Sequence, residues 1–167
     1  MVPRLLRADE RVAQPWRNGG GLTREVAGNP GDDFGWRISV AEIAESGPFS
    51  RFEDCDRTLV LLDGGPATLG DARLEAGDML VFSGDEPIAA AISRPATAFN
   101  VITRRGRFHH QVARHVAGDP RPMLIFALSD GVCIDGIALG RHDAVLIDRE
   151  NAPAVSGDTL AVYLTES

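Results

Sequence analysis

Short apolar runs, separated by glycine and proline, recur along the whole chain. The runs are rich in Val, Ile, Leu and Phe, and 18 glycines and 10 prolines are spread between them. Residues 36–40 alternate apolar and polar side chains, which is the period of a β-strand. The runs that we expect to form strands are Trp36–Ile43, Thr58–Leu62, Asp78–Phe82, Ile88–Ile92, Ala98–Thr103, Met123–Leu128, Ala144–Ile147 and Leu160–Leu164.

The period of an α-helix, 3.6 residues, is nearly absent from the chain. Only a short helical turn near Ala8–Ala13 is expected. Many short strands bounded by turn-forming residues are typical of sandwiches and barrels. The sequence therefore predicts an all-β fold.

Part of the apolar pattern occurs twice. Leu59–Phe82 aligns without a gap on Leu124–Ile147, which places Asp78 over Asp143. A repeated order of strands and turns indicates a duplicated β-unit. We therefore expect two jelly-roll-like halves packed together as a single unit, approximately 1–106 and 107–167, with Arg104–Pro122 as the connector. Exchange of strands between the halves stays open at this stage.

Composition and charge exclude several classes of protein. The 167 residues suit one ordinary domain, and 44% hydrophobic with 25% charged residues excludes a disordered chain or a coiled coil. The net charge is -7 and no basic run is present, so neither nucleic acid nor an anionic membrane is an expected partner. All 17 basic residues are arginine, the side chain whose planar fork fits a carboxylate.

The N-terminal segment gives no sign of export. Met1–Glu10 is charged and has no apolar core, so we expect no signal peptide, and no stretch approaches the ~20 apolar residues of a membrane helix. Cys55 and Cys133 have no metal-binding spacing, and without an export signal they are expected to be free thiols. The predicted location is the cytoplasm.

The sequence offers little support for a metal or for nucleophilic catalysis. Gly77-Asp78 followed by Pro87 resembles one of the two cupin sequence boxes, but the usual cupin set of His and Glu ligands is missing. His109 and His110 are adjacent, so on a strand they point to opposite faces. No serine lies in a nucleophile elbow. We predict no metal, no cofactor and no catalytic residue.

Three segments combine residues suited to a binding site. In 16–25, three glycines beside Asn18 allow close backbone approach, with Gly20 as a candidate anion donor. In 47–58, Phe49, Ser50 and Arg57 mix aromatic and polar groups. In 99–106, Asn100 and Arg104 share one strand face, as Arg37 and Ser39 do in 36–40. A flexible turn, a loop pinned to the core by its aromatics and a solvated strand end are the alternatives for the three segments.

Together the segments 15–21, 36–39, 47–59 and 99–106 resemble the HutD/Ves family of small bicupins. The resemblance implies a duplicated cupin fold, generally without the cupin metal ligands. One branch of the family accompanies histidine-utilisation enzymes and is regarded as a regulator or sensor of pathway intermediates, and the other is described as induced by stress. Glu53-Asp54-Cys55 departs from a Pro-containing turn of the family, so the conformation of that loop is not carried over.

The resemblance and the arginines lead to three hypotheses. The first is a metal-free sensor or regulator in histidine utilisation, which binds a small carboxylate such as urocanate or formylglutamate. Its expected ligand-binding residues are Asn18, Gly20, Arg37, Ser39, Phe49, Ser50, Arg57, Asn100 and Arg104. The second is an isomerase or hydrolase acting on a small organic acid, with His109, Glu25 or Glu42 as nominal acid or base. The third is a protein-interaction module in a stress response. A homodimer formed through edge strands stays open.

Overall fold

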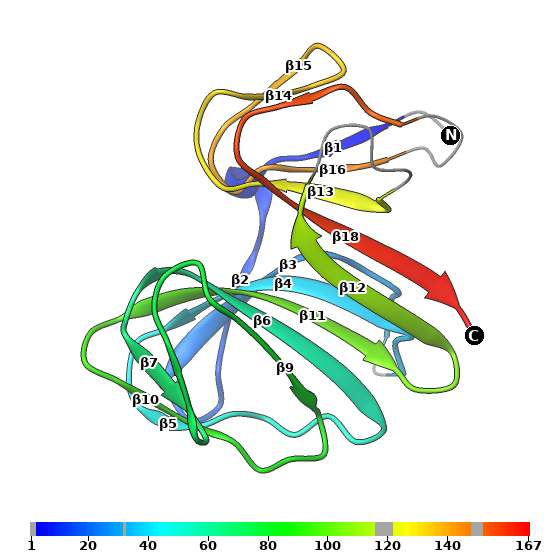
Figure 1. The fold of residues 1–167 in the computed structure, drawn as a ribbon. Coiled ribbons are helices and arrows are strands. Elements are labelled where there is room, and N and C mark those ends of the chain that lie inside the picture. Colours follow the sequence, from blue (N-terminus) through cyan, green and yellow to red (C-terminus); the bar gives the residue numbers. More distant parts are fainter. Residues whose placement is uncertain (1–2, 32, 116–121, 148–151) are drawn as a thin grey trace. The chain divides into compact units, whose positions relative to one another are not determined.

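The computed structural model describes residues 3–31, 33–115, 122–147 and 152–167. These residues form β-strands and one turn of 3-10 helix, Ala8–Glu10 (Figure 1). Each of the eight predicted runs overlaps a strand, and Trp36–Ile43 matches strand β4 at both ends. The prediction of an all-β fold is confirmed.

The chain divides into two compact units. The first unit is Val12–His109 with Ser167, and the second is Met1–Arg11 with His110–Glu166. The N-terminal segment thus belongs to the second unit, where its strand β1 (Arg4–Leu6) pairs with β16 (Ala144–Leu146). The chain therefore begins in the second unit, builds the first and then returns.

The first unit contains a six-stranded and a four-stranded antiparallel sheet. The larger sheet has the order β2-β3-β4-β11-β6-β9, and the smaller has the order β5-β10-β7-β8. Their strands are β2 (Ala13–Pro15), β3 (Gly21–Gly28), β4 (Trp36–Ile43), β5 (Gly47–Pro48), β6 (Cys55–Gly64), β7 (Ala67–Leu69), β8 (Ala72–Leu74), β9 (Met79–Ser83), β10 (Ala89–Ile92) and β11 (Ala96–Arg104). Side chains from both sheets form one apolar core, to which Ile43, Leu61 and Leu69 contribute.

The second unit contains a five-stranded sheet, β1-β16-β13-β18-β12, and a three-stranded sheet, β15-β14-β17. The remaining strands are β12 (Phe108–Arg114), β13 (Leu124–Ala127), β14 (Val132–Ile134), β15 (Ile137–Leu139), β17 (Val155–Ser156) and β18 (Thr159–Glu166). The expected connector Arg104–Pro122 was wrong in part, because it contains β12. Residues 116–121 of that connector lie outside the described residues.

The second unit repeats the strand order of the first. Strands β7 and β14, and likewise β8 and β15, begin and end at positions that the gapless alignment of the two sequence repeats makes equivalent. The turns repeat as well, because Gly77 (φ 94°) and His142 (φ 69°) both adopt the left-handed conformation. Asp78 then accepts a 2.8 Å hydrogen bond from the N–H three residues earlier, and Asp143 accepts one of 2.9 Å. The duplication expected from the sequence is confirmed.

Candidate functional site

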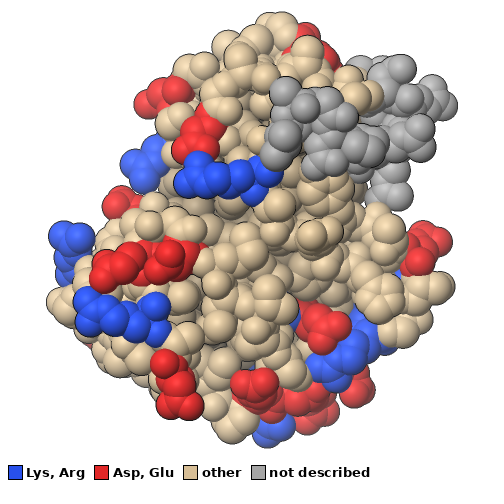
Figure 2. Space-filling model, in the orientation of Figure 1, with Lys and Arg blue, Asp and Glu red and all other residues tan. Residues whose placement is uncertain are grey.

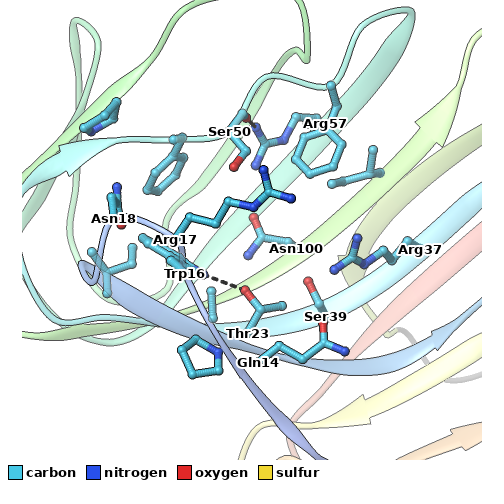
Figure 3. Close-up of a pocket in the computed structure, with 17 residues that line it drawn as sticks. Gln14, Trp16, Arg17, Asn18, Thr23, Arg37, Ser39, Ser50, Arg57 and Asn100 are labelled. Carbon is cyan, nitrogen blue, oxygen red and sulfur yellow. Dashed lines mark hydrogen bonds between the residues drawn. The ribbon is translucent and has the colours of Figure 1, made fainter. Parts of the chain in front are cut away.

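The first unit contains a cavity of about 610 Å³ on one face of its six-stranded sheet (Figure 3). Strand register brings the polar side chains of its floor together, because residues directly opposite in antiparallel strands share a face. Asn100 on β11 lies opposite Ser39 on β4, and Ile102 lies opposite both Arg37 on β4 and Arg57 on β6. Three strands therefore point these five side chains toward the same space.

Seven of the nine ligand-binding residues expected from the sequence line this cavity. They are Asn18, Arg37, Ser39, Phe49, Ser50, Arg57 and Asn100. They come from the hairpin between β2 and β3, from three neighbouring strands and from the loop between β5 and β6. The structure thus joins the three sequence segments at a single site.

Arg57 is the most buried charge of the cavity, with 7% of its surface exposed. Its guanidinium donates one 3.0 Å hydrogen bond, from Nη1 to the carbonyl of Ser50, while its buried Nε–H has no partner. No acidic side chain among the described residues forms an ion pair with it. Arg57 is therefore a buried cation with unused hydrogen-bond donors at the wall of a cavity.

Aromatic rings hold the Arg57 guanidinium in place. Its central carbon lies 4.8 Å from the ring centre of Phe82, 5.0 Å from that of Phe52 and 5.9 Å from that of Phe49. The negative faces of aromatic rings attract a cation, but they cannot accept the planar pair of hydrogen bonds that a carboxylate accepts. Burial lowers the pKa of Arg57 to about 10, and attraction to the Cys55 sulfur opposes the effect weakly. Arg57 thus stays charged at neutral pH in a place that penalises its charge.

Ser39 and Asn100 add two neutral polar groups to the cavity floor. Their exposed fractions are 6% and 7%, and neither side chain forms a hydrogen bond with another described residue. Buried hydroxyl and amide groups are normally satisfied by protein or by ordered water. With Arg57, they give the floor three buried polar side chains whose donors and acceptors face the same space.

Arg37 stands at one side of the cavity, over the ring of Phe34 at 5.7 Å. Its Nε lies 3.7 Å from Oε1 of Glu25, which is too long for a hydrogen bond, and its Nε–H has no other acceptor. The Glu25 side chain is half exposed, so water screens this pair and weakens it. Arg37 keeps most of its donors available on the cavity side.

The hairpin between β2 and β3 forms another wall, and hydrogen bonds within it fix its shape. The N–H of Gly19 donates to the Trp16 carbonyl at 3.0 Å, and the N–H of Gly20 donates to Oδ1 of Asn18 at 2.9 Å. The indole N–H of Trp16 donates to the Thr23 hydroxyl at 2.8 Å, the dashed line of Figure 3. This bond, with an edge-on contact to Phe49 at 5.9 Å, turns the Trp16 ring into an apolar wall.

Arg17 projects from this hairpin across the cavity toward Ser50 and Arg57 (Figure 3). Its side chain is exposed and forms no hydrogen bond or ion pair with any described residue. Three arginines therefore reach the cavity: one deep, one at the side and one at the mouth. None of the lining residues is acidic, so their combined charge is strongly positive.

The structure does not bring Gly20 or Arg104 to the cavity. The N–H of Gly20 is already occupied by Asn18, which leaves it no donor for an anion. Arg104 shares the face of Asn100 and Ile102 but lies at the strand end, where its Nε donates to the Phe34 carbonyl and pairs with Asp33, both at 3.2 Å. Both residues therefore have structural partners in place of the expected role.

Gln14, Trp16, Arg17, Thr23 and Phe52 also line the cavity, although they were not among the expected ligand-binding residues. Gln14 and Thr23 are direct cross-strand partners of β2 and β3. The sequence held a signal for Trp16 and Arg17, which lie just before Asn18 and the three glycines. It held none for Gln14, because the pairing of β2 with β3 is needed to place that side chain.

The lining contains no carboxylate, imidazole or thiol. His109, Glu25 and Glu42, the nominal acid–base residues, lie outside it, and Glu42 instead pairs with Arg24 at 3.1 Å. Within the described residues, no group of three or more His, Cys, Asp and Glu side chains is arranged to hold a metal ion. The arrangement is suited to binding an anion and offers no side chain for proton transfer at neutral pH.

Other features of the described chain are plain. Cys55 and Cys133 are both free, as expected, and burial raises the pKa of the Cys55 thiol. Among the described residues, no helix has the length and apolar character that crossing a bilayer requires. On the face shown in Figure 2, arginines and acidic residues are interspersed and do not form a patch of one sign.

Comparison with known proteins agrees with this description. The family model HutD matches residues 8–163. Protein Ves of Cronobacter sakazakii is 37% identical over 126 residues, which cover 68% of this chain and 70% of that protein. An uncharacterized 21.2 kDa protein in the hutC 3' region of Pseudomonas putida is 34% identical over 142 residues, 77% of this chain and 75% of its own.

A solved structure shows the same architecture over the full length. HutD from Pseudomonas fluorescens SBW25, in a formate condition, superposes with a TM-score of 0.86 at 30% identity, covering 99% of this chain and 100% of that chain. The duplicated strand order defines a bicupin, and its first unit contains the arginine-lined cavity. This chain belongs to the HutD family.

Proposed function

We propose that this protein binds a small carboxylate in the cavity of its first unit, without a metal, and acts as a sensor or regulator in histidine utilisation. The observation that carries the proposal is Arg57, a buried cation that lines the cavity, has no acidic partner among the described residues and donates one side-chain hydrogen bond there. Burying an unpaired charge is costly, and an anion in the cavity would offset that cost. A carboxylate matches the guanidinium fork, and each charge-assisted hydrogen bond contributes roughly 1.5–3 kcal/mol.

The rest of the cavity suits the body of such a ligand. Ser39 and Asn100 offer a hydroxyl and an amide next to Arg57, while Trp16, Phe49 and Phe52 supply apolar walls. A carboxylate with a planar or short polar body therefore fits the chemistry, and urocanate and formylglutamate are both of this kind. A volume of about 610 Å³ lies within the usual range for small-molecule sites.

The pathway part of the proposal draws on family membership. The relative from Pseudomonas putida is described by its position in the hutC 3' region, and the solved relative is called HutD. Neither description states a ligand. A binding role without catalysis is favoured over an isomerase or hydrolase because the lining lacks an acid–base side chain.

Isothermal titration calorimetry with matched ligands tests the proposal. We expect urocanate and N-formylglutamate to be bound and their neutral amides to be bound at least tenfold more weakly, because a charge-assisted hydrogen bond is worth a factor of ten or more. Arg57→Met should abolish binding, whereas Arg104→Gln, which alters an arginine outside the cavity, should leave it unchanged. No heat of binding for either acid at millimolar concentration would contradict the ligand class.

A further inference from the structure

Arg105 does not line the cavity, but it holds the loop that forms part of the cavity wall. Its guanidinium binds through all three nitrogens: Nε to Oδ1 of Asp56 at 2.9 Å, Nη1 to Oδ2 of Asp85 at 2.9 Å, and Nη2 to the Cys55 carbonyl at 2.9 Å and the Ser83 hydroxyl at 2.7 Å. These partners lie at the start of β6, at the end of β9 and just beyond it. Arg105 thus joins two strand ends of the six-stranded sheet to its own position after β11.

The backbone around this arginine is bound just as closely. Arg105 N–H donates to the Asp54 carbonyl at 2.8 Å, and Asp54 N–H donates to Oδ1 of Asp85 at 3.1 Å. Asp54 has a φ of 58°, a left-handed conformation that costs free energy for a residue other than glycine. The two hydrogen bonds of the Asp54 backbone stabilise this conformation and offset its cost. The Asp54 N–H and then Arg105 hold the pKa of Asp85 below its usual range, so these contacts stabilise the ionised carboxylate.

The segment that Arg105 holds continues into the wall of the cavity. Phe52 N–H donates to the Gly84 carbonyl at 2.8 Å, and Gly84 N–H donates to the Cys55 carbonyl at 2.8 Å. A side chain at Gly84 would lie 2.2 Å from the Phe52 carbonyl, so this close approach of the two backbones requires glycine. The same loop supplies the ring of Phe52 and the carbonyl of Ser50, two of the groups that hold the Arg57 guanidinium.

We propose that Arg105 is a positioning residue: it locks the loop 50–54 in the conformation that aims the free donors of Arg57 into the cavity. The inference rests on the proposed function, because the orientation of the Arg57 guanidinium affects binding only if the ligand is a carboxylate. Among the described residues, the Arg57 side chain donates one hydrogen bond, to the Ser50 carbonyl, and Phe52 is one of the three rings around it, so the loop supplies two of the groups that orient it. A loop released from Arg105 and Asp85 would remove the Ser50 and Phe52 contacts and leave the Arg57 side chain less tightly oriented, with Phe82 and Phe49 as its remaining aromatic contacts.

The first test is the discrimination between an acid and its amide. In Arg105→Gln, the affinity for N-formylglutamate should fall about tenfold, while the affinity for the corresponding diamide, which gains little from Arg57, should change by less than twofold. Asp85→Asn should reproduce this pattern. Arg73→Gln breaks an exposed ion pair with Glu75 elsewhere in the unit and serves as the matched control, with no expected change. Equal losses for acid and amide would overturn the positioning role in favour of general loosening, and so would an unchanged affinity for the acid.

The second test needs no ligand, so its outcome separates this inference from the proposed function. The central carbon of the Arg57 guanidinium lies over three aromatic rings, so the NMR signals of the guanidinium N–H protons should be displaced upfield by ring currents. The displacement should be lost in Arg105→Gln at a temperature where circular dichroism shows both proteins folded, and it should persist in Arg73→Gln. A protein that binds no carboxylate but shows this loss would refute the ligand proposal alone. An Arg57 signal that is identical in Arg105→Gln would refute the positioning role.

Discussion

Replacing Arg57 with methionine should abolish carboxylate binding without destabilising the protein. Burial lowers the pKa of Arg57 to about 10, more than two pH units below an ordinary guanidinium, which corresponds to a cost of about 3 kcal/mol for the charged form. The unfolded chain holds this proton more tightly than the folded one. The cost is therefore fully present below pH 10 and declines as the pH rises above 10.

Methionine removes this cost and keeps an unbranched apolar stem of similar length. It also removes the hydrogen bond to the exposed Ser50, worth about 1 kcal/mol, and the attraction to the aromatic rings, worth about 1 kcal/mol. The free energy of unfolding should therefore rise by about 1 kcal/mol, the balance of these three contributions. In other proteins, replacing a buried ion pair with apolar residues of similar volume is often neutral or stabilising.

Urea unfolding followed by tryptophan fluorescence measures this change. Both tryptophans, Trp16 and Trp36, lie in the first unit, so the signal reports the unit that contains Arg57. Calorimetry on the same samples measures carboxylate binding. If Arg57→Met lost more than about 2 kcal/mol of stability, the size of loss expected when a residue needed for folding is removed, the reasoning would be refuted.

Three further changes test other parts of the structure. Asn100→Ala should weaken carboxylate binding about tenfold in a titration with little change in melting temperature, because its amide has no protein partner among the described residues. In Asp143, burial raises the pKa, but hydrogen bonds from Ala8, Gly140 and Arg7 outweigh it and lower the pKa. The stability that Asp143 contributes is present above the unfolded carboxyl pKa and lost as the pH falls through the folded value. Urea unfolding of Asp143→Asn should show a deficit at pH 7 that narrows toward pH 2. Gly21→Ala should lower the melting temperature measured by circular dichroism, because its new methyl group would lie 2.3 Å from the Glu42 carbonyl.

The strands were largely predictable because their buried faces are apolar. The main exception is β3, Gly21–Gly28, which begins with glycine and carries polar side chains on both faces. One of its faces is turned toward the cavity, where polar residues such as Thr23 replace the apolar ones of a core strand. A register shift between Glu25 and Ala27 interrupts the alternation further. A strand at a binding site thus lacks the pattern by which strands are recognised.

The sequence predicted which side chains share a strand face, but not how far along each strand the cavity reaches. Alternation correctly placed Asn100, Ile102 and Arg104 on one side of β11, but Arg104 lies two residues, or about 7 Å, beyond Ile102. At that distance it meets Asp33 and Phe34, which are far away in the sequence. The sequence also could not predict that Arg57 has no acidic partner among the described residues, because ion pairing depends on which distant segments come together in the fold. The arginine-only composition therefore pointed to a chemistry without saying which arginine supplies it.

A crystal structure of the protein with N-formylglutamate or urocanate tests the central claim most directly. We expect a carboxylate in the first unit's cavity, with its oxygens at hydrogen-bond distance, about 3 Å, from N–H groups of the Arg57 guanidinium. Asn100 or Ser39 should be an additional partner of the ligand. A ligand bound elsewhere, or one in the cavity with its carboxylate turned away from Arg57, would contradict the claim.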